Sequence, residues 1–421
     1  MTRRLMPAVG LASILSCLLA AQGQTPTVTA GGEVLEGVWL GPGAALFRGI
    51  PYAAAPVGDL RWRPPELHRP RPGSQSARSF SPVCVQTERL TAWEKSIATA
   101  FGTSDKVDAT PRNTNEDCLY LNVWTNNLGG GTTQPVMVWI HGGSNVAGEG
   151  SSPWYDGSML AKRGVVVVTI NYRLGVFGFL ALPDLSAESP HRVSGNYGLL
   201  DQLAALRWVQ ADIKQFGGDP ERVTVFGESA GSLDLVALMA SPSSAGLFHR
   251  AIAQSGAPMG IALPLAQAEA QGAALVEASG SDSNGGSAAM LRRKPAAELL
   301  QLADRQVLAG KLQIQPVIDG WLMPDAPGRI FSAGKQRKVP LIIGSNAREM
   351  TTLRAYLPPI PRTVAGYRGW LAQTFGADAE RFGELYPAES DGEVDGALID
   401  ATTELLFTCP ARFAARGMTR A

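Results

Sequence analysis

Short runs of β-branched and other apolar residues alternate with helical stretches through the middle of the chain, and this alternation most limits the possible fold. The apolar runs are Val136–Ile140, Val165–Ile170, Val223–Phe226 and Leu341–Ile343. None shows the polar–apolar alternation of a half-exposed strand, so we expect strands that are buried on both faces. Between the second and third runs, apolar residues recur every three or four positions over Leu199–Phe216, as on one face of a helix. The order predicts an α/β fold with a mostly parallel, doubly wound sheet and helices on both faces.

Two regions depart from this alternation. Gly31–Ala53 consists of short extended pieces divided by glycines, which predicts a small antiparallel N-terminal sheet. Leu265–Ala303 has a helical pattern that is interrupted by the polar, glycine-rich stretch 280–286. We interpret it as a helical insertion that lies over the carboxyl ends of the strands, where open α/β sheets bind ligands.

Composition and charge narrow the class of partner. The chain has 37 Lys and Arg residues and 37 Asp and Glu residues, so it lacks the positive field that attracts phosphate backbones. We therefore expect no nucleic-acid partner. The four histidines are scattered and no cysteine pair has the spacing of metal ligands, so we expect no metal site. With 45% hydrophobic and 18% charged residues, the chain can form a large core.

The N-terminus has the layout of an export signal. Arg3 and Arg4 precede an uncharged, mainly apolar stretch over Leu5–Ala21, and a small-residue cleavage site follows at Gly23. We predict that residues 1–23 are a signal peptide and that residues 24–421 form a single secreted or periplasmic domain without a stable membrane anchor. The alternative is an uncleaved anchor, for which the stretch is marginally short.

Three cysteines follow the signal: Cys84, Cys118 and Cys409. In an oxidising compartment we expect Cys84 and Cys118, 34 positions apart, to form a disulfide. Closing a loop of that length stabilises a fold by roughly 3 to 4 kcal/mol. Cys409 is then expected to be a buried free thiol, or to need a partner outside the chain.

The segment Gly227–Gly231 places Ser229 between two glycines, after the strand that ends at Phe226 and before the helical stretch Leu233–Ala240. A nucleophile on a sharp strand-to-helix turn needs small neighbours, because the backbone is strained and the side chain must stand clear. We therefore interpret Ser229 as a catalytic nucleophile. The alternative is an ordinary turn serine.

A second glycine-rich segment, His141–Asn145, comes directly after the predicted strand that ends at Ile140. Ester hydrolysis passes through an oxyanion that needs preorganised N–H donors, and glycines let the backbone approach closely. We assign the donors to the backbone N–H groups of Gly143, Ser144 and Ala230. The alternative for this segment is a simple glycine turn. His141 is expected to be structural rather than a proton carrier.

These motifs, with several others in the same order, resemble the type-B carboxylesterase and cholinesterase family of α/β-hydrolases from about Val34 to the last residue. The segments that carry the resemblance are Phe47–Ala53, Leu60–Trp62, Glu116–Val123, His141–Asn145, Asn171–Gly175, Gly195–Asn196, Asp201–Gln202 and Gly227–Gly231. The resemblance implies a triad of serine, glutamate and histidine. It also implies a Cys84–Cys118 disulfide and the ion pairs Glu116–Arg61 and Arg173–Asp201.

Carried over by motif, the acidic triad member is Glu349, just beyond the predicted strand Leu341–Ile343. Met350 stands where the family usually has a glycine. A surface glutamate is the alternative reading of Glu349. The histidine has no counterpart, because all four histidines precede Glu349 whereas the family order is serine, acid, histidine.

The chain ends in a helical pattern, Thr402–Met418. By analogy with the family we expect the last strand and the histidine loop to be missing, as in a C-terminal truncation. Losing the base of a triad costs on the order of 10⁶ in turnover, so this chain is expected to be nearly inert.

The resemblance thus implies a serine carboxylesterase that hydrolyses a small-molecule ester through an acyl-enzyme and needs no cofactor. The alternative is a non-catalytic binding or adhesion protein that has kept the fold, although such proteins typically lose the nucleophile. Glu228, beside Ser229, either tunes the electrostatics of the site or is a structural carboxylate. Trp93 lies between Cys84 and Cys118, and either lines the pocket or packs under that loop.

Overall fold

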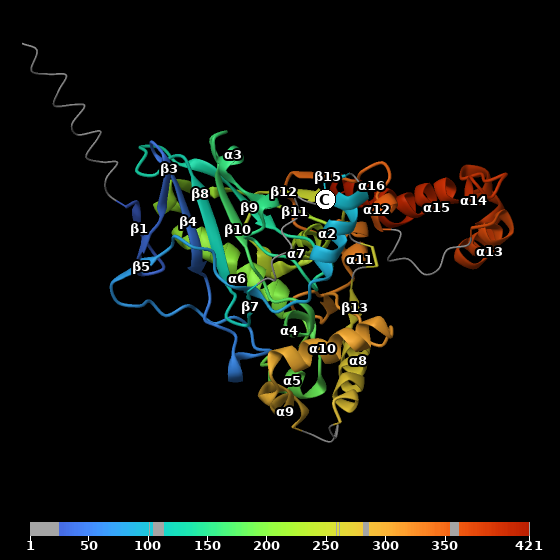
Figure 1. Ribbon diagram of the computed structural model, residues 1–421, viewed down its shortest axis with the longest axis horizontal. Coiled ribbons are helices and arrows are strands. Elements are labelled where there is room, and N and C mark those ends of the chain that lie inside the picture. The colour runs from blue at the N-terminus through green and yellow to red at the C-terminus, as the bar shows by residue number, and fades with distance from the viewer. Residues whose placement is uncertain are drawn as a thin grey trace, which may run out of the picture.

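The computed structural model describes residues 25–100, 102–103, 113–257, 259–260, 262–280, 286–353 and 362–420 (Figure 1). The predicted signal peptide, residues 1–23, lies outside these ranges. No helix in the described ranges is both long and apolar enough to cross a bilayer.

An eight-stranded mixed sheet forms the centre of the molecule, in the order β15-β12-β11-β9-β10-β8-β4-β3 (Figure 1). Its strands are β3 (Val38–Gly41), β4 (Ala44–Pro51), β8 (Tyr120–Thr125), β9 (Gln134–Ile140), β10 (Val166–Ile170), β11 (Gly218–Glu228), β12 (Arg250–Gln254) and β15 (Leu341–Gly344). The five strands from β15 to β10 are parallel, and β8, β4 and β3 are added antiparallel. All four apolar runs of the sequence are strands of the parallel part, as predicted. The expectation that they are buried on both faces was wrong for β15, where Ile342 is 68% exposed because β15 is the edge strand of the described sheet.

Successive residues of β10 pack on opposite faces of the sheet. Val166 and Val168 belong to the main core, together with residues of helices α6 (Tyr197–Asp212) and α7 (Ala230–Ala240). Val167 packs instead in a smaller cluster with Ala161 of helix α3 (Ser158–Ala161). Strand side chains alternate with period two, so a continuous apolar run serves both faces. The prediction of helices on both faces is confirmed.

Helix α6 is the predicted apolar stripe. Its buried residues include Leu199, Leu203 and Leu206, and a 3₁₀ turn continues it to Phe216. Gly217 ends the helix at φ 80°, a left-handed conformation that a residue with a Cβ adopts only at a cost. The chain therefore turns there into β11.

The N-terminal region is divided between two sheets. Strands β1 (Thr27–Ala30) and β2 (Glu33–Glu36) pair antiparallel, and β5 (Ser74–Ser76) adds parallel to β2. The remainder of the region, β3 and β4, joins the antiparallel end of the main sheet. A small N-terminal sheet exists as predicted, although it is mixed rather than wholly antiparallel.

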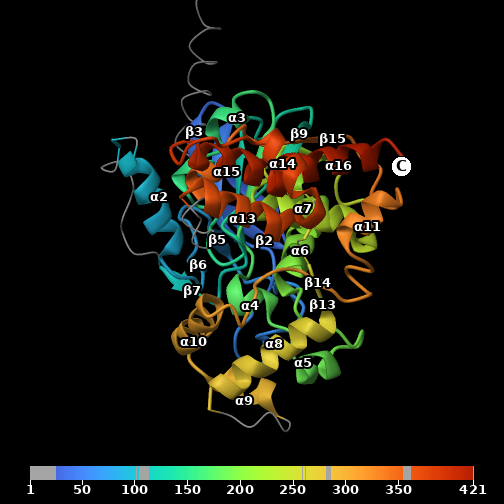
Figure 2. The same cartoon turned by 90° about the vertical axis from the view of Figure 1, so that its right-hand side faces the viewer.

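The predicted insertion consists of α8 (Leu265–Ala278), α9 (Ser287–Arg293) and α10 (Ala296–Leu308). It lies with α4 (Gly175–Phe179) and α5 (Pro183–Glu188), beyond the end of the sheet at which β10 leads into α4 (Figures 1 and 2). This is the carboxyl end of the parallel strands, as predicted.

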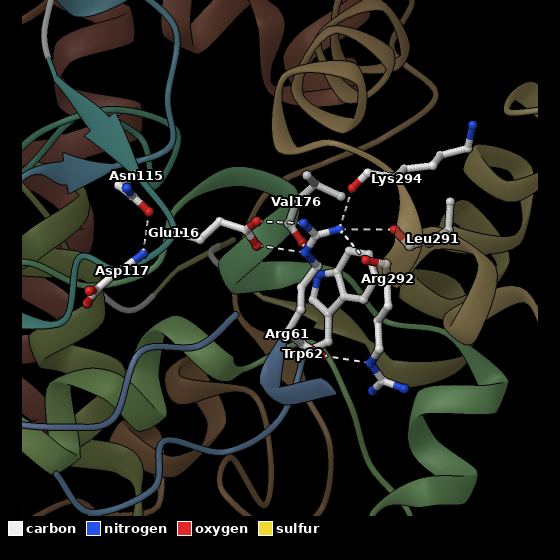
Figure 3. Close-up of polar contacts among 9 residues, drawn as sticks. All are labelled: Arg61, Trp62, Asn115, Glu116, Asp117, Val176, Leu291, Arg292 and Lys294. Carbon is white, nitrogen blue, oxygen red and sulfur yellow. Dashed lines mark hydrogen bonds and ion pairs between the residues drawn. The ribbon is translucent and has the colours of Figure 1, made fainter. Parts of the chain in front are cut away.

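One guanidinium fastens the insertion to the rest of the molecule (Figure 3). Arg61 donates two hydrogen bonds to Glu116, at 2.6 and 2.5 Å, which confirms the predicted ion pair. Its Nη1 also donates to the carbonyl oxygens of Leu291, Arg292 and Lys294, at 2.8 to 3.1 Å. Leu291 and Arg292 are in the last turn of α9 and Lys294 directly follows it, so the cation offsets unpaired acceptors and the negative end of the helix dipole.

Helices α13 (Val364–Phe375), α14 (Ala379–Leu385) and α15 (Val394–Thr403) project from the β15 side of the molecule, at the right of Figure 1. They share a small core of their own, which includes Tyr367, Leu371 and Leu398. A π-helical turn, Glu404–Thr408, then joins α15 to α16 (Cys409–Met418). The remaining elements are β6 (Val83–Cys84), α2 (Arg89–Ala100), β7 (Thr114–Asn115), β13 (Leu263–Pro264), β14 (Val317–Ile318), α11 (Pro327–Ser332) and α12 (Met350–Leu353).

Candidate active site

Ser229 occupies the sharp turn between β11 and α7, with φ 53° and ψ −123°. A non-glycine residue held in such a conformation costs about 1 to 3 kcal/mol, and it persists only where its surroundings fix it. Three backbone hydrogen bonds do so. The Ser229 N–H donates to the carbonyl of Gln254 at 2.9 Å, and the Ser229 carbonyl accepts from Ser232 and Leu233 at 3.0 Å. The strained turn inferred from the sequence is present.

The loop after β9, residues 141–148, lies directly against this turn; we call it the glycine loop. A Cβ at Gly142 would come within 2.7 Å of the Glu228 carboxylate and 3.1 Å of the Ser229 Cβ. A Cβ at Gly231 would come within 2.1 Å of the Ile140 carbonyl oxygen. The two segments touch backbone to backbone, which explains why glycine stands at both positions. The structure thus brings together the two motifs that the sequence separates.

The far end of the glycine loop is held by Gln86, which sequence reasoning missed. The Gln86 side chain donates to the Gly148 carbonyl and accepts from the Gly148 N–H, both at 2.8 Å. Gln86 is buried and lies two residues after Cys84, which is joined to Cys118 as predicted, with 5.0 Å between the Cα atoms. The one signal in the sequence that could have pointed to Gln86 is its position two residues after Cys84.

Glu349 follows β15 and forms specific hydrogen bonds. One carboxylate oxygen accepts from the Ser255 hydroxyl at 2.6 Å and from the Asn346 N–H at 2.7 Å. Ser255 comes directly after Gln254, the residue that holds the Ser229 backbone, and is itself strained at φ 55°. Met350 is accommodated with its side chain buried, 2% exposed, at the start of α12, and its N–H donates to the Thr403 hydroxyl at 3.2 Å. Nothing in the local sequence marks Ser255, since its partner is 94 positions away.

Glu228 lies between the two sides of the site. Its pKa is raised to about 7 by partial removal of its carboxylate from water and, secondarily, by the negative charge of Glu349. The residue keeps solvent contact at the surface of the turn. Removal from water and the neighbouring negative charge both favour the neutral form of the Glu228 carboxyl group.

The four histidines are all within the described residues. His141 is buried, its pKa is lowered to about 4 by burial, and its Nδ1 donates to the Gly142 carbonyl at 2.8 Å, so it is structural as expected. His249 contacts the Val223 N–H, about 16 Å along β11 from Glu228 at 3.3 Å per residue. His191 stacks on Trp321, and His68 contacts Glu33. None of these contacts places a histidine side chain beside Ser229 or Glu349.

Three further expectations have clear outcomes. Arg173 and Asp201 form the predicted ion pair, fully buried, with N–O distances of 2.7 Å. Trp93, on α2, donates from its indole N–H to the Thr352 carbonyl at 3.3 Å and so packs beside the segment that follows Glu349. Cys409 is free but exposed on α16, so the expectation that it is buried was wrong. Helix α16 turns this position outward, away from its buried face of Pro410, Ala411 and Ala414.

A strained serine at the turn between a parallel strand and a helix, beside a glycine loop on a mixed sheet of this order, is the arrangement of the α/β-hydrolase fold. Solved structures agree. A thermophilic PNB esterase superposes with a TM-score of 0.77 at 34% identity, covering 94% of this chain and 78% of that one. The Geobacillus stearothermophilus carboxylesterase EST55 superposes with a TM-score of 0.79 at 32% identity, covering 94% and 77%.

The model of the carboxylesterase family matches residues 24–420, and the chain belongs to that family. Fumonisin B1 esterase of Sphingopyxis macrogoltabida is 45% identical over 361 residues, 84% of this chain and 61% of that protein. Para-nitrobenzyl esterase of Bacillus subtilis (strain 168) is 38% identical over 380 residues, 88% and 71% respectively. The chain thus spans about three fifths of the first of these relatives and under three quarters of the second.

Proposed function

We propose that this protein is a serine carboxylesterase that hydrolyses small-molecule carboxylic esters through an acyl-enzyme on Ser229. The observation that carries the proposal is the strained conformation of Ser229 at the start of α7, against the glycine loop. A strain of this kind is retained where it serves a reaction, because an ordinary turn has cheaper conformations. It also favours an enzyme over a non-catalytic binding protein.

In the proposed reaction the Ser229 Oγ bonds to the ester carbonyl carbon, and its proton passes to a base. The N–H groups of Gly143, Ser144 and Ala230 stabilise the oxyanion, each contributing roughly 3 to 4 kcal/mol. The C–O bond to the alcohol then breaks, the base returns the proton to the leaving alcohol, and water hydrolyses the acyl-enzyme. No cofactor takes part in these steps.

The base in this proposal is an imidazole that docks against Glu349. None of the four histidines of the sequence is assigned the role, because the contacts of three place them elsewhere and burial leaves His141 too weak a base, with its pKa lowered to about 4. Glu349 is suited to orient an imidazole and to stabilise its cation, since it is already fixed by Ser255 and Asn346.

The substrate class follows from the family and from the names of its relatives. One relative is named for fumonisin B1 and another for para-nitrobenzyl esters. We extend to this chain only what these names share, which is a carboxylic ester of a small molecule. We also propose that the protein is exported to the periplasm or secreted; the Cys84–Cys118 disulfide supports this.

The test uses the 421-residue chain with p-nitrophenyl acetate and increasing free imidazole. We expect turnover above the imidazole background that saturates with imidazole, together with a covalent adduct on Ser229 after treatment with a fluorophosphonate at the same imidazole concentrations. Ser229→Ala should abolish both. Turnover that is equal in the two proteins, or an adduct on another residue, would overturn the proposal and favour the binding role.

A further inference from the structure

A buried carboxylate that the proposed reaction does not use lies on the nucleophile's own helix. Asp234 is the fifth residue of α7, which begins immediately after Ser229, and it is 0% exposed. Its two oxygens accept hydrogen bonds from neutral amides, Asn145 Nδ2 at 3.0 Å and Gln202 Nε2 at 2.6 Å. Burying a carboxyl group among neutral donors costs free energy. We therefore expect Asp234 to have a role that compensates for this cost.

Asn145 belongs to the most strained part of the glycine loop. Three successive residues have positive φ: Gly143 at 107°, Ser144 at 57° and Asn145 at 57°. Two of them carry side chains, so the loop would relax unless its surroundings held it. The same three residues include the proposed oxyanion donors Gly143 and Ser144.

The Asn145 side chain is the clamp on this strained stretch. Its amide donates to Asp234, and its oxygen faces the Tyr172 hydroxyl at 3.1 Å. The Tyr172 hydroxyl has one proton to donate and faces two acceptors, this oxygen and the His141 carbonyl, which lies 2.9 Å away. The Asn145 carbonyl also accepts from the Gly175 N–H at 2.6 Å. All of these side chains are buried, so water does not compete for the bonds.

We propose that Asp234 is a positioning residue, which fixes the glycine loop to the nucleophile's helix through Asn145 and so holds the Gly143 and Ser144 N–H groups at a set distance from the Ser229 Oγ. Gln202 anchors the carboxylate from behind, on α6. Gln86 holds the other end of the loop, at Gly148, so the loop is fixed at two points. The inference rests on the proposed function, because the N–H groups matter only if an oxyanion forms there.

The following variants distinguish a positioning role of Asp234 from simple burial of its side chain. Asp234→Leu replaces the carboxylate with an apolar side chain and removes both acceptors, whereas Asp234→Asn keeps the shape and an acceptor for Asn145. Asn145→Gly removes the amide that donates to Asp234, and glycine readily adopts the positive φ of this position. Ser244→Ala is the matched control, because the Ser244 hydroxyl is also fully buried and bonds the Leu238 carbonyl at the opposite end of α7.

The first readout is the rate at which a fluorophosphonate labels Ser229 in the presence of saturating free imidazole, which supplies the base. We expect Asp234→Leu and Asn145→Gly to slow labelling by roughly 10- to 100-fold, since misplacing a single oxyanion donor has about this effect. Asp234→Asn should slow it by no more than about threefold, and Ser244→Ala should label like the parent. If the parent labels at Ser229 and Asp234→Leu labels equally fast, the inference fails while the proposed function stands.

The second readout does not depend on reactivity. Hydrogen exchange of the backbone amides in residues 141–150 should accelerate in Asp234→Leu and Asn145→Gly and stay unchanged in Ser244→Ala. Unchanged protection in Asn145→Gly would overturn the inference even if Asp234→Leu did not fold. Failure of the parent to label at all would count against the proposed function instead.

Discussion

The glycine loop and the Glu349 segment hold the two sides of the proposed site, the first in the interior of the sheet and the second at its edge. Ile140, His141 and Asn145 are buried, and the loop touches the Ser229 turn backbone to backbone. Glu349 follows β15, the edge strand in the described sheet, where Ile342 is 68% exposed. The difference teaches that the loop side is fixed by close backbone contacts and buried hydrogen bonds, whereas the Glu349 side is held by a few hydrogen bonds at the sheet edge.

The largest difference between the two sides should come from replacing one glycine on each side with alanine. Gly231→Ala places a Cβ 2.1 Å from the Ile140 carbonyl, so we expect loss of Ser229 labelling and a fall of about 3 kcal/mol or more in unfolding free energy. Gly344→Ala, on β15, meets nothing within 4 Å and should change stability by less than about 0.5 kcal/mol. Urea unfolding measures both, and equal losses would refute the comparison.

The next effect concerns the acid itself. Glu349→Gln keeps the shape but removes the charge that orients an imidazole, so imidazole-supported turnover should fall by about 100-fold. Stability should change by less than about 1 kcal/mol, because this side is held at the sheet edge. A large loss of stability with unchanged turnover would mean that Glu349 is structural.

The free energy of unfolding should also depend on pH through the buried side of the site, and not through the sheet edge. Burial raises the pKa of Asp234 from 3.8 to about 7, so the folded protein binds a proton that the unfolded chain releases between about pH 4 and 7. Stability must then fall as pH rises through this window. Asp234→Asn removes the effect, and its advantage over the parent should grow by about 2 to 4 kcal/mol from pH 4 to 8.

Urea unfolding at several pH values checks this. Glu228, whose pKa is also raised to about 7, contributes the same trend to both proteins and cancels in the difference. A constant difference between parent and variant would show that Asp234 is ionised in the same range folded and unfolded.

The smallest effect belongs to Ser255. Ser255→Ala removes the 2.6 Å hydrogen bond to Glu349, while the Asn346 N–H still holds the same oxygen. We expect about a fivefold loss of imidazole-supported turnover, equivalent to about 1 kcal/mol. A loss as large as that of Glu349→Gln would place Ser255 on a par with the acid.

Features encoded in local patterns could be predicted from the sequence. The strands and α6 follow from continuous apolar runs and a helical stripe, and the turn at Ser229 from its flanking glycines. The Arg61–Glu116 and Arg173–Asp201 pairs came from the family resemblance alone. The residues that hold the site in place could not be predicted, since Asn145 and Asp234 are 89 positions apart. The one hint in the sequence is Asp234 itself, a charged residue within the mainly apolar helix α7.

The guanidinium of Arg61 gives the fold a practical property. It bonds Glu116 beside the disulfide and the last carbonyls of α9 at once, so a single side chain joins three segments far apart in the sequence (Figure 3). Chimeras that graft the α8–α10 insertion from one esterase onto another will therefore transfer cleanly only if this arginine and its carboxylate travel with the graft.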